Sequence, residues 1–183
     1  MTLLSIRTLG DPVLREQTRP VVAFDDALRR LADDMFETMY GAPGVGLAAN
    51  QVGLSIASFV YDDQEGNKGF VANPVLSDLE EEQTETEGCL SIPGPYHLTS
   101  RALRVRLRGQ DVEGGDVDVR AEGLLARIFQ HESDHLVGRL FIDRLDEAGR
   151  RDVMRQLREI ELERASRGSS GAVAPPSEKE PLT

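Results

Sequence analysis

Apolar residues recur at helical spacing in the first quarter of the chain. They stand three or four positions apart, at Leu28, Leu31, Ala32, Met35, Phe36 and Met39. This spacing puts them on one face of an amphipathic α-helix. Asp25 or Asp26 can cap the start of the helix, and Gly41 and Pro43 are expected to end it. We interpret this segment as a packing helix.

Two more helices are predicted in the second half of the chain. Residues 124–136 are bounded by glycines and have an apolar side that contains Leu125, Ile128 and Phe129. A last helix is expected over residues 147–165, with four apolar side chains facing inward: Val153, Leu157, Ile160 and Leu162. The segment that follows is rich in Gly, Ser and Pro. We therefore expect one domain, residues 1–167, and a flexible C-terminal tail, residues 168–183.

Strand patterns lie between the first two helices. Residues 56–61 read as a strand, and 70–76 as another that is interrupted at Pro74. In residues 103–108 apolar residues alternate with three arginines, and residues 117–120 repeat the alternation after a Gly-Gly turn. The arginines are expected to lie on a solvated face of the sheet.

The composition is that of an ordinary globular chain. Its 183 residues are 39% hydrophobic and 29% charged, with a formal net charge of −11. Phosphate binding needs a basic face, so nucleic acid is not expected as a ligand. The distribution of apolar residues along the chain predicts neither a signal peptide nor a membrane span. The lone cysteine, Cys89, fits a reducing compartment, and we expect a cytoplasmic protein.

The strongest chemical signal is His131-Glu132-Ser133-Asp134-His135, inside the second predicted helix. Residues four apart lie on one face of a helix, so both imidazoles can bind one metal ion. Glu132 can then accept a proton from metal-bound water. Histidines that only satisfy local hydrogen bonds are the alternative, disfavoured because two of the chain's three histidines fall here. The motif predicts a metal-dependent hydrolase.

A catalytic metal site usually has three protein ligands, so a third ligand is needed. One metallopeptidase pattern would place a histidine at position 141, where Phe141 stands. Another takes a downstream glutamate, for which the last helix offers three surface candidates: Glu159, Glu161 and Glu163. Cys89, in a segment shaped like a loop or strand end, is the remaining candidate, since a thiolate suits a soft metal site. His97 as a fourth ligand would instead make a non-catalytic metal-binding module.

Three segments, in this order, resemble the signature motifs of bacterial-type peptide deformylases. They are Gly44-Val45-Gly46-Leu47-Ala48-Ala49-Asn50-Gln51, Glu87-Gly88-Cys89-Leu90-Ser91 and Gln130-His131-Glu132-Ser133-Asp134-His135-Leu136. The resemblance implies a hydrolase that removes the formyl group from the N-terminal formyl-methionine of nascent polypeptides, releasing formate. It also implies an α+β fold, in which a mixed or antiparallel sheet surrounds the central metal-binding helix and an N-terminal and a C-terminal helix flank it.

The resemblance also implies a metal site. Cys89, His131 and His135 correspond to the metal ligands and Glu132 to the catalytic acid/base. One divalent ion is implied, ferrous iron physiologically, with zinc, nickel or cobalt as alternatives. Glu132 would take a proton from metal-bound water and return it to the departing amine.

Five further positions correspond to substrate contacts. Gln51 and the backbone N–H of Leu90 match donors to the formyl oxygen. Val45, Gly46 and Gly88 match the substrate cleft, where an extended peptide would bind like an added strand. The implied partners are formyl-methionyl nascent peptides, with the ribosome near the exit tunnel as an open possibility and no membrane.

Two positions depart from the family pattern. Ser133 stands where an apolar residue is usual. Tyr96 stands where many relatives carry charged residues, including an arginine near the substrate backbone, and puts that contact in doubt. Glu87 and Arg101 are expected to pair and brace the site, and Asp134 is expected to be structural.

Overall fold

The structure, a computed structural model, describes residues 2–169. Its helices are α1 (Asp26–Gly41), α2 (Gly123–Leu136) and α3 (Glu147–Ser169), and its strands are β1 (Gly46–Ala48), β2 (Ser58–Asp62), β3 (Lys68–Cys89), β4 (Ile92–Gln110) and β5 (Asp116–Glu122). Short 3₁₀ helices are η1 (Pro12–Arg15), η2 (Ala49–Val52) and η3 (Phe141–Asp143). The predicted α+β fold class is confirmed.

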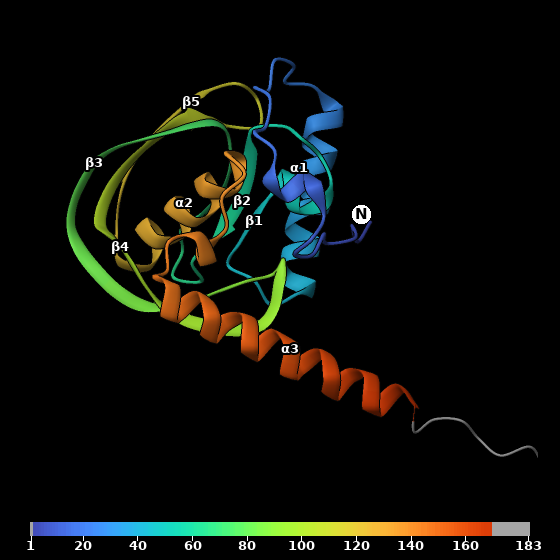
Figure 1. The fold of residues 1–183 in the computed structure, drawn as a ribbon. Coiled ribbons are helices and arrows are strands. Elements are labelled where there is room, and N and C mark those ends of the chain that lie inside the picture. Colours follow the sequence, from blue (N-terminus) through green and yellow to red (C-terminus); the bar gives the residue numbers. More distant parts are fainter. Residues whose placement is uncertain (1, 170–183) are drawn as a thin grey trace, which may run out of the picture.

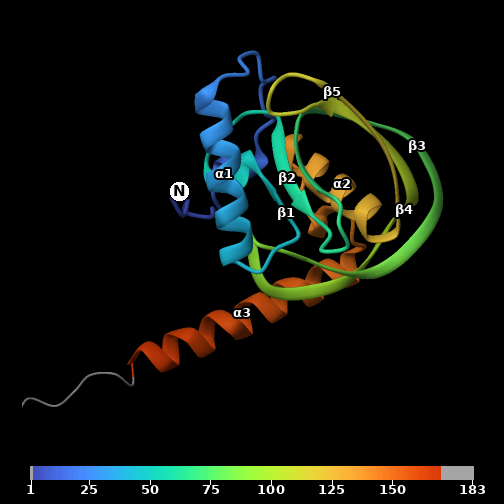
Figure 2. The ribbon, with the colours of Figure 1, turned by 180° about the vertical axis from the view of Figure 1, so that it is seen from behind.

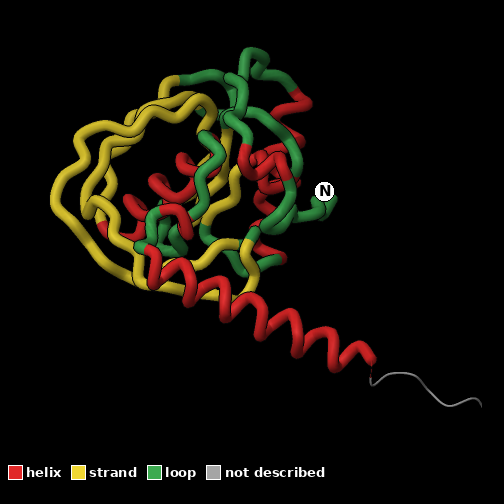
Figure 3. The backbone as a smooth tube through the Cα atoms, in the orientation of Figure 1, coloured by secondary structure: helices red, strands yellow, loops and turns green. Residues whose placement is uncertain are grey.

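The five strands form one antiparallel sheet in the order β1-β2-β3-β4-β5. β3 and β4 pair along most of their length, from Cys89 opposite Ile92 to Ala72 opposite Gln110. The long strands curve around α2, which lies on their concave side (Figures 1 and 2). The tube in Figure 3 shows the same wrapping of strands around the helix. The predicted central position of the metal-binding helix is therefore confirmed.

β3 is longer than the pattern predicts because it bends where an interruption was expected. Its register with β4 shifts between Ala72 and Val75, on either side of Pro74. Asn73 has a left-handed φ of 52°, which asparagine tolerates better than most residues. Its side chain also bonds the backbone N–H and carbonyl of Val21, at 2.8 and 2.9 Å. This bulge carries the strand past a proline that cannot donate to the ladder.

α2 is buried on nearly all sides. Its predicted apolar residues Leu125, Ile128 and Phe129 pack in one hydrophobic core with Phe59 of β2 and Leu107 of β4. Burying a side chain such as Phe129, which is 0% exposed, contributes roughly 1.5–3 kcal/mol. The core therefore fixes the helix so that its polar motif is held in the interior.

α1 and α2 cover opposite faces of the β1–β2 pair. α1 starts at the predicted position because Asp25 caps it, accepting from the N–H groups of Ala27 and Leu28 at 3.0 Å each. Val60 packs in the core that contains the apolar face of α1, and its neighbour Phe59 packs in the core of α2. Successive residues of a strand point to opposite faces, and this alternation lets one short strand pair serve both helices.

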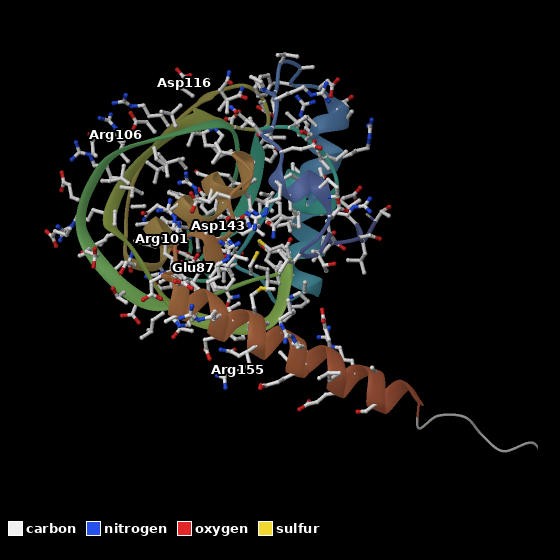
Figure 4. The ribbon with its side chains drawn as sticks, in the orientation of Figure 1. Glu87, Arg101, Arg106, Asp116, Asp143 and Arg155 are labelled. Carbon is white, nitrogen blue, oxygen red and sulfur yellow. The ribbon has the colours of Figure 1, made fainter. Side chains whose placement is uncertain are left out.

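The convex face of the sheet is charged, as predicted. Arg104 pairs with Glu122, and Arg106 with Asp118 at 2.6 Å, both across β4 and β5. Figure 4 shows Arg106 and Asp116 pointing away from the concave side. These arginines belong to a solvated face.

α3 packs on the body through its first half and then projects beyond it (Figure 1). Val153 is fully buried, and Leu157 and Ile160 are half-buried. Leu162 is 65% exposed, so the prediction that it faces inward is wrong. The helix has left the sheet by that point and continues to Ser169. The rest of the predicted tail lies outside the described residues. None of the helices in residues 2–169 is long and apolar enough to cross a membrane.

Candidate metal centre

The end of β3 and one face of α2 bring the three predicted ligands together. Sγ of Cys89 lies 3.3 Å from Nε2 of His135, which lies 3.2 Å from Nε2 of His131. All three ligand atoms are within 4.8 Å of one another. Cys89 is the last residue of β3, and the turn to β4 points it toward α2.

This donor set fits a single divalent ion. Nδ1 of His131 donates to Oε1 of Glu87 at 2.6 Å, so in the neutral ring its Nε2 carries a lone pair aimed at the shared point. A thiolate and two imidazoles are ligands of zinc and of other soft or borderline ions. Three ligands leave a coordination position for water or substrate, which is typical of a catalytic site.

The alternative ligands lie elsewhere. Among residues 2–169, the group whose ligand atoms converge on one point contains Cys89 and the two motif histidines. Nδ1 of His97 lies 2.9 Å from its neighbour's carbonyl, on Leu98. The three glutamates of α3 that could have served as ligands are exposed and do not belong to this group. The site therefore keeps three protein ligands.

Glu87 fixes the orientation of the His131 ring through a hydrogen bond from Nδ1, the nitrogen that does not face the other ligands. Besides the bond from His131, it accepts from Arg101 at 2.5 and 3.1 Å and from Arg127 at 2.8 Å. The expected pair of Glu87 and Arg101 is confirmed, and Figure 4 shows the two side chains near α2. Burial alone would raise the pKa of Glu87, but the hydrogen bonds from His131 and Arg101 outweigh it and hold that pKa well below its usual range. The ionised carboxylate keeps the His131 proton on Nδ1.

The same network continues to Asp134, on α2. Asp134 accepts from Arg101 at 2.5 Å and from Arg144 at 2.5 and 2.7 Å. The side chain of Arg101 is 0% exposed, and that of Asp134 is 7% exposed. Asp134 has the expected structural role, since it ties α2 to β4 and to the segment before α3.

Glu132 is a buried carboxyl beside the ligands. It is 3% exposed, and its Oε2 finds no hydrogen-bond partner within residues 2–169. Burial, aided by the charge of Glu87, raises the pKa of Glu132 to about 7 against the opposing effect of His131 and Arg101. Such a carboxyl can take up and return a proton near neutral pH. A Cβ at Gly46 would overlap the Glu132 carboxylate, so this close approach requires glycine.

Gln51 directs its amide nitrogen toward the ligands. Its Oε1 accepts from the N–H of Ala48 at 2.8 Å, which fixes the orientation of the amide. Nε2 then lies 3.1 Å from Oγ of Ser91 and 3.6 Å from Sγ of Cys89. Gln51 therefore presents a donor beside the metal centre. The sequence pattern assigned no role to Ser91.

A cleft of about 550 Å³ opens onto these groups. It is bordered by eight of the nine predicted site residues: Val45, Gly46, Gln51, Gly88, Cys89, Leu90, His131 and Glu132. The ninth, His135, is 0% exposed behind them. Arg127 also borders the cleft, and the sequence analysis missed it. Its spacing, four residues before His131 on one helix face, was the available signal.

Comparison with known proteins identifies the family. A family model described as polypeptide deformylase matches residues 3–151. The chain belongs to the peptide deformylase family. Peptide deformylase 1 of Corynebacterium glutamicum is 52% identical to this deformylase over 162 residues, covering 86% of this chain and 96% of the relative. The peptide deformylase of Acidothermus cellulolyticus is 50% identical over 161 residues, with 88% and 89% covered.

Solved structures of deformylases share the fold. The peptide deformylase of Legionella pneumophila has a TM-score of 0.85 and 38% identity, covering 90% of this chain and 98% of its own. That of Thermus thermophilus has a TM-score of 0.78 and 46% identity, with 86% and 99% covered. The predicted activity is thereby confirmed: this deformylase is a metal-dependent hydrolase that removes the formyl group from the N-terminal formyl-methionine of nascent peptides. A metallopeptidase and a non-catalytic metal-binding module are excluded.

Proposed function

We propose that Cys89, His131 and His135 hold the divalent ion and that Glu132 moves the protons during deformylation. The observation that carries this proposal is a buried Glu132 carboxyl, whose Oε2 finds no hydrogen-bond partner within residues 2–169, next to three converging ligand atoms. The bound ion would supply Lewis acidity and lower the pKa of a water molecule. We propose ferrous iron as the physiological ion. Zinc, nickel or cobalt would serve as substitutes, because a thiolate and two imidazoles accept all of these ions.

The protein groups around the formyl amide have separate tasks. Glu132 accepts a proton from the attacking water and returns it to the departing amine nitrogen, so that formate and a free amine leave. Nε2 of Gln51 and the backbone N–H of Leu90 donate to the formyl oxygen as negative charge develops there. The fixed orientation of Gln51 supports this role, because its donor needs no rearrangement during the reaction.

The substrate peptide binds in the cleft as an added strand. β1 stands at one end of the strand order, and its first residue, Gly46, borders the cleft together with the preceding Val45. An extended peptide can therefore hydrogen-bond to this edge, with Gly88 allowing close approach on the other side. Because a formyl carbon carries only a hydrogen, a tight pocket around it would exclude the bulkier acetyl group.

The setting of the reaction follows from its substrate. We propose that the protein works in the cytoplasm, where formyl-methionyl chains emerge, and that contact with the ribosome near the exit tunnel would bring it to them. The net charge of −11 disfavours a direct role for nucleic acid. We also propose that residues 1–167 are the catalytic domain and that the tail is dispensable for catalysis.

Substitution of Glu132 tests the mechanism. Glu132→Ala should retain its metal, because the ligands are other residues. Its formate release from a formyl-methionyl peptide should fall by about two orders of magnitude or more, because both proton transfers lose their carrier. Ser133→Ala is the matched control, since Ser133 follows Glu132 on the helix and is not among the residues that border the cleft. Near-parent turnover by a metal-loaded Glu132→Ala variant would contradict the proposal.

A further inference from the structure

Tyr96 is a large aromatic residue that stands exposed at the border of the cleft. It borders the same cleft as Cys89, His131 and Glu132, yet it is 62% exposed. Scattered exposed apolar residues are common on protein surfaces, but this one is continuous with the substrate site. A molecule that extends out of the cleft can cover the ring and remove it from water.

An irregularity in the pairing of β3 with β4 places this ring over Gly88. The regular pairs on either side of Gly88 leave that single residue opposite the four residues 93–96. Such bulges re-aim side chains beside active sites. A Cβ built on Gly88 would lie 2.5 Å from Cε1 and 2.6 Å from Cδ1 of Tyr96. The ring therefore covers the side of Gly88 on which another residue would carry its side chain.

α3 supports the segment that carries Tyr96. A Cβ at Gly94 would meet Cδ1 of Ile160, on α3, at 2.5 Å. A Cβ at Gly149, also on α3, would meet Cε1 of His97 at 2.8 Å. The helix therefore contacts the chain both before and after Tyr96. A ring on a supported backbone has less freedom to lose when a ligand covers it, which favours a role in recognition.

The exposed part of the cleft border is uncharged. Within residues 2–169, the acidic and basic side chains that border the cleft are buried: Glu87, Arg127, His131 and Glu132. The border residues that are exposed carry no charge: Pro43, Thr86, Gly94, Tyr96 and Leu124. A peptide that leaves the cleft therefore meets a largely apolar rim. Such a rim favours apolar side chains, because a charged one would lose water without gaining a partner.

The ring lies within reach of the residues that follow formyl-methionine. Gly88 precedes the ligand Cys89, and adjacent Cα atoms are about 3.8 Å apart. The Tyr96 ring touches Gly88, so its edge lies within about 10 Å of the Cys89 sulfur. An extended peptide advances about 3.3 Å per residue. With the formyl group at the metal ligands, its second or third residue can therefore contact the ring.

We propose that Tyr96 is a specificity-determining residue that favours substrates with an apolar, above all aromatic, side chain at the second or third position. This inference rests on the proposed function, which places the formyl group at the metal ligands and the peptide in the cleft. A large apolar side chain there covers the exposed ring and buries its own surface. An aromatic one gains the further attraction of paired rings. The reaction is unchanged, because the contact lies away from the formyl amide.

The test compares three formyl-methionyl tripeptides that carry Ala-Ala, Phe-Ala or Ala-Phe after the methionine. The measured quantity is kcat/KM for formate release by the metal-loaded enzyme. The parent should process at least one phenylalanine peptide about threefold or more better than the alanine peptide. In Tyr96→Ala this ratio should fall to about one, and Tyr96→Phe should keep it because the ring remains. The difference should lie mainly in KM, since the ring binds substrate and transition state alike.

Leu98→Ala is the matched control. Leu98 stands two residues further along β4 and is 58% exposed, but it is not among the residues that border the cleft. The ratio should therefore stay at the parent value. The Ala-Ala peptide reports basal deformylation within each variant, so a general loss of activity cancels from the ratio. Metal content is measured for every variant, because Gly88, which Tyr96 covers, precedes the ligand Cys89.

Two results would overturn the inference. One is a parent enzyme whose ratio stays below about threefold for both phenylalanine peptides. The other is a ratio that remains at the parent value in Tyr96→Ala, which would place the source of the preference elsewhere in the cleft. Failure of the parent to release formate from all three peptides would instead contradict the proposed function.

Discussion

At the scale of single residues, Glu87 links the metal centre to the protein interior. The side chains of Glu87 and Arg101 are 4% and 0% exposed, and the two groups are joined by two hydrogen bonds. Removing one partner of such a pair leaves an uncompensated buried charge, which costs about 3–5 kcal/mol. The carboxylate also orients His131, so a single substitution is expected to affect both stability and metal binding.

Glu87→Gln tests this double role. The amide keeps the shape but loses the charge, so Arg101 and Arg127 lose their counterion. We expect a lower free energy of unfolding and a metal affinity about 10–100-fold weaker, measured by denaturant titration and by competition with a chelator. Glu85→Gln, at an exposed position of the same strand, is the control. Parent-like metal affinity in Glu87→Gln would show that His131 does not depend on this carboxylate.

The chemical core of the site could be predicted from residue spacing because two ligands and the acid/base lie within one helical turn. Cys89 was predicted as a ligand from its sequence motif, and the turn after β3 directs its side chain toward the other ligands. The contacts of Glu87 with Arg127 and with His131 could not be predicted, because they join β3 to α2. Such contacts depend on how the sheet wraps around the helix, and no local pattern encodes that.

At the scale of elements, helices followed their patterns more closely than strands did. Asp25 and the spacing of apolar residues set α1 within one or two residues of its predicted bounds. β3 was underestimated because residues 78–87 are mostly acidic and polar, with no alternation to mark a strand. They are held extended by pairing with β4, where Arg101 lies opposite Gln83 and Arg104 opposite Glu80. Non-local pairing of this kind overrides local propensity.

Gly46 tests how β1 positions the site. In Gly46→Ala the new methyl group would overlap the Glu132 carboxylate, so either β1 or Glu132 must move. We expect formate release to fall by about tenfold or more, since small misplacements of catalytic groups are costly, while the melting temperature changes little. Gly41→Ala is the control, because its Cβ would meet its nearest neighbour at an ordinary 3.5 Å. Equal activity in both variants would rule out a tight fit between Gly46 and Glu132.

At the scale of the whole molecule, α3 packs on the rest of the protein at its start and projects beyond it at its end. Val153 packs in a core with Leu14 and Ile92, and a Cβ at Gly94 would meet Ile160 at 2.5 Å. The helix up to Ile160 therefore supports β4 and the wall of the cleft. Beyond Ile160, Leu162 is exposed, so the last part of the helix contributes little to the core.

Truncation tests separately what the start and the end of α3 contribute to stability and activity. A chain ending after Arg167 should keep the parent's melting temperature and kcat/KM within about twofold, because it retains the whole of this core. A chain ending after Asp146, which loses Val153, should melt at a clearly lower temperature, since removing a fully buried aliphatic side chain costs roughly 2 kcal/mol or more. A large loss of activity on truncation after Arg167 would assign the tail a catalytic role.

The ligands come from two elements that lie far apart along the chain. A bound ion would therefore act as a removable cross-link between the end of β3 and α2. The unfolded chain cannot hold these three atoms at one point, so binding free energy adds to folding free energy by mass action. At a free ion concentration one hundred times the dissociation constant this amounts to about 2.7 kcal/mol. Metal supply would then set how long the folded enzyme survives as well as how fast it works.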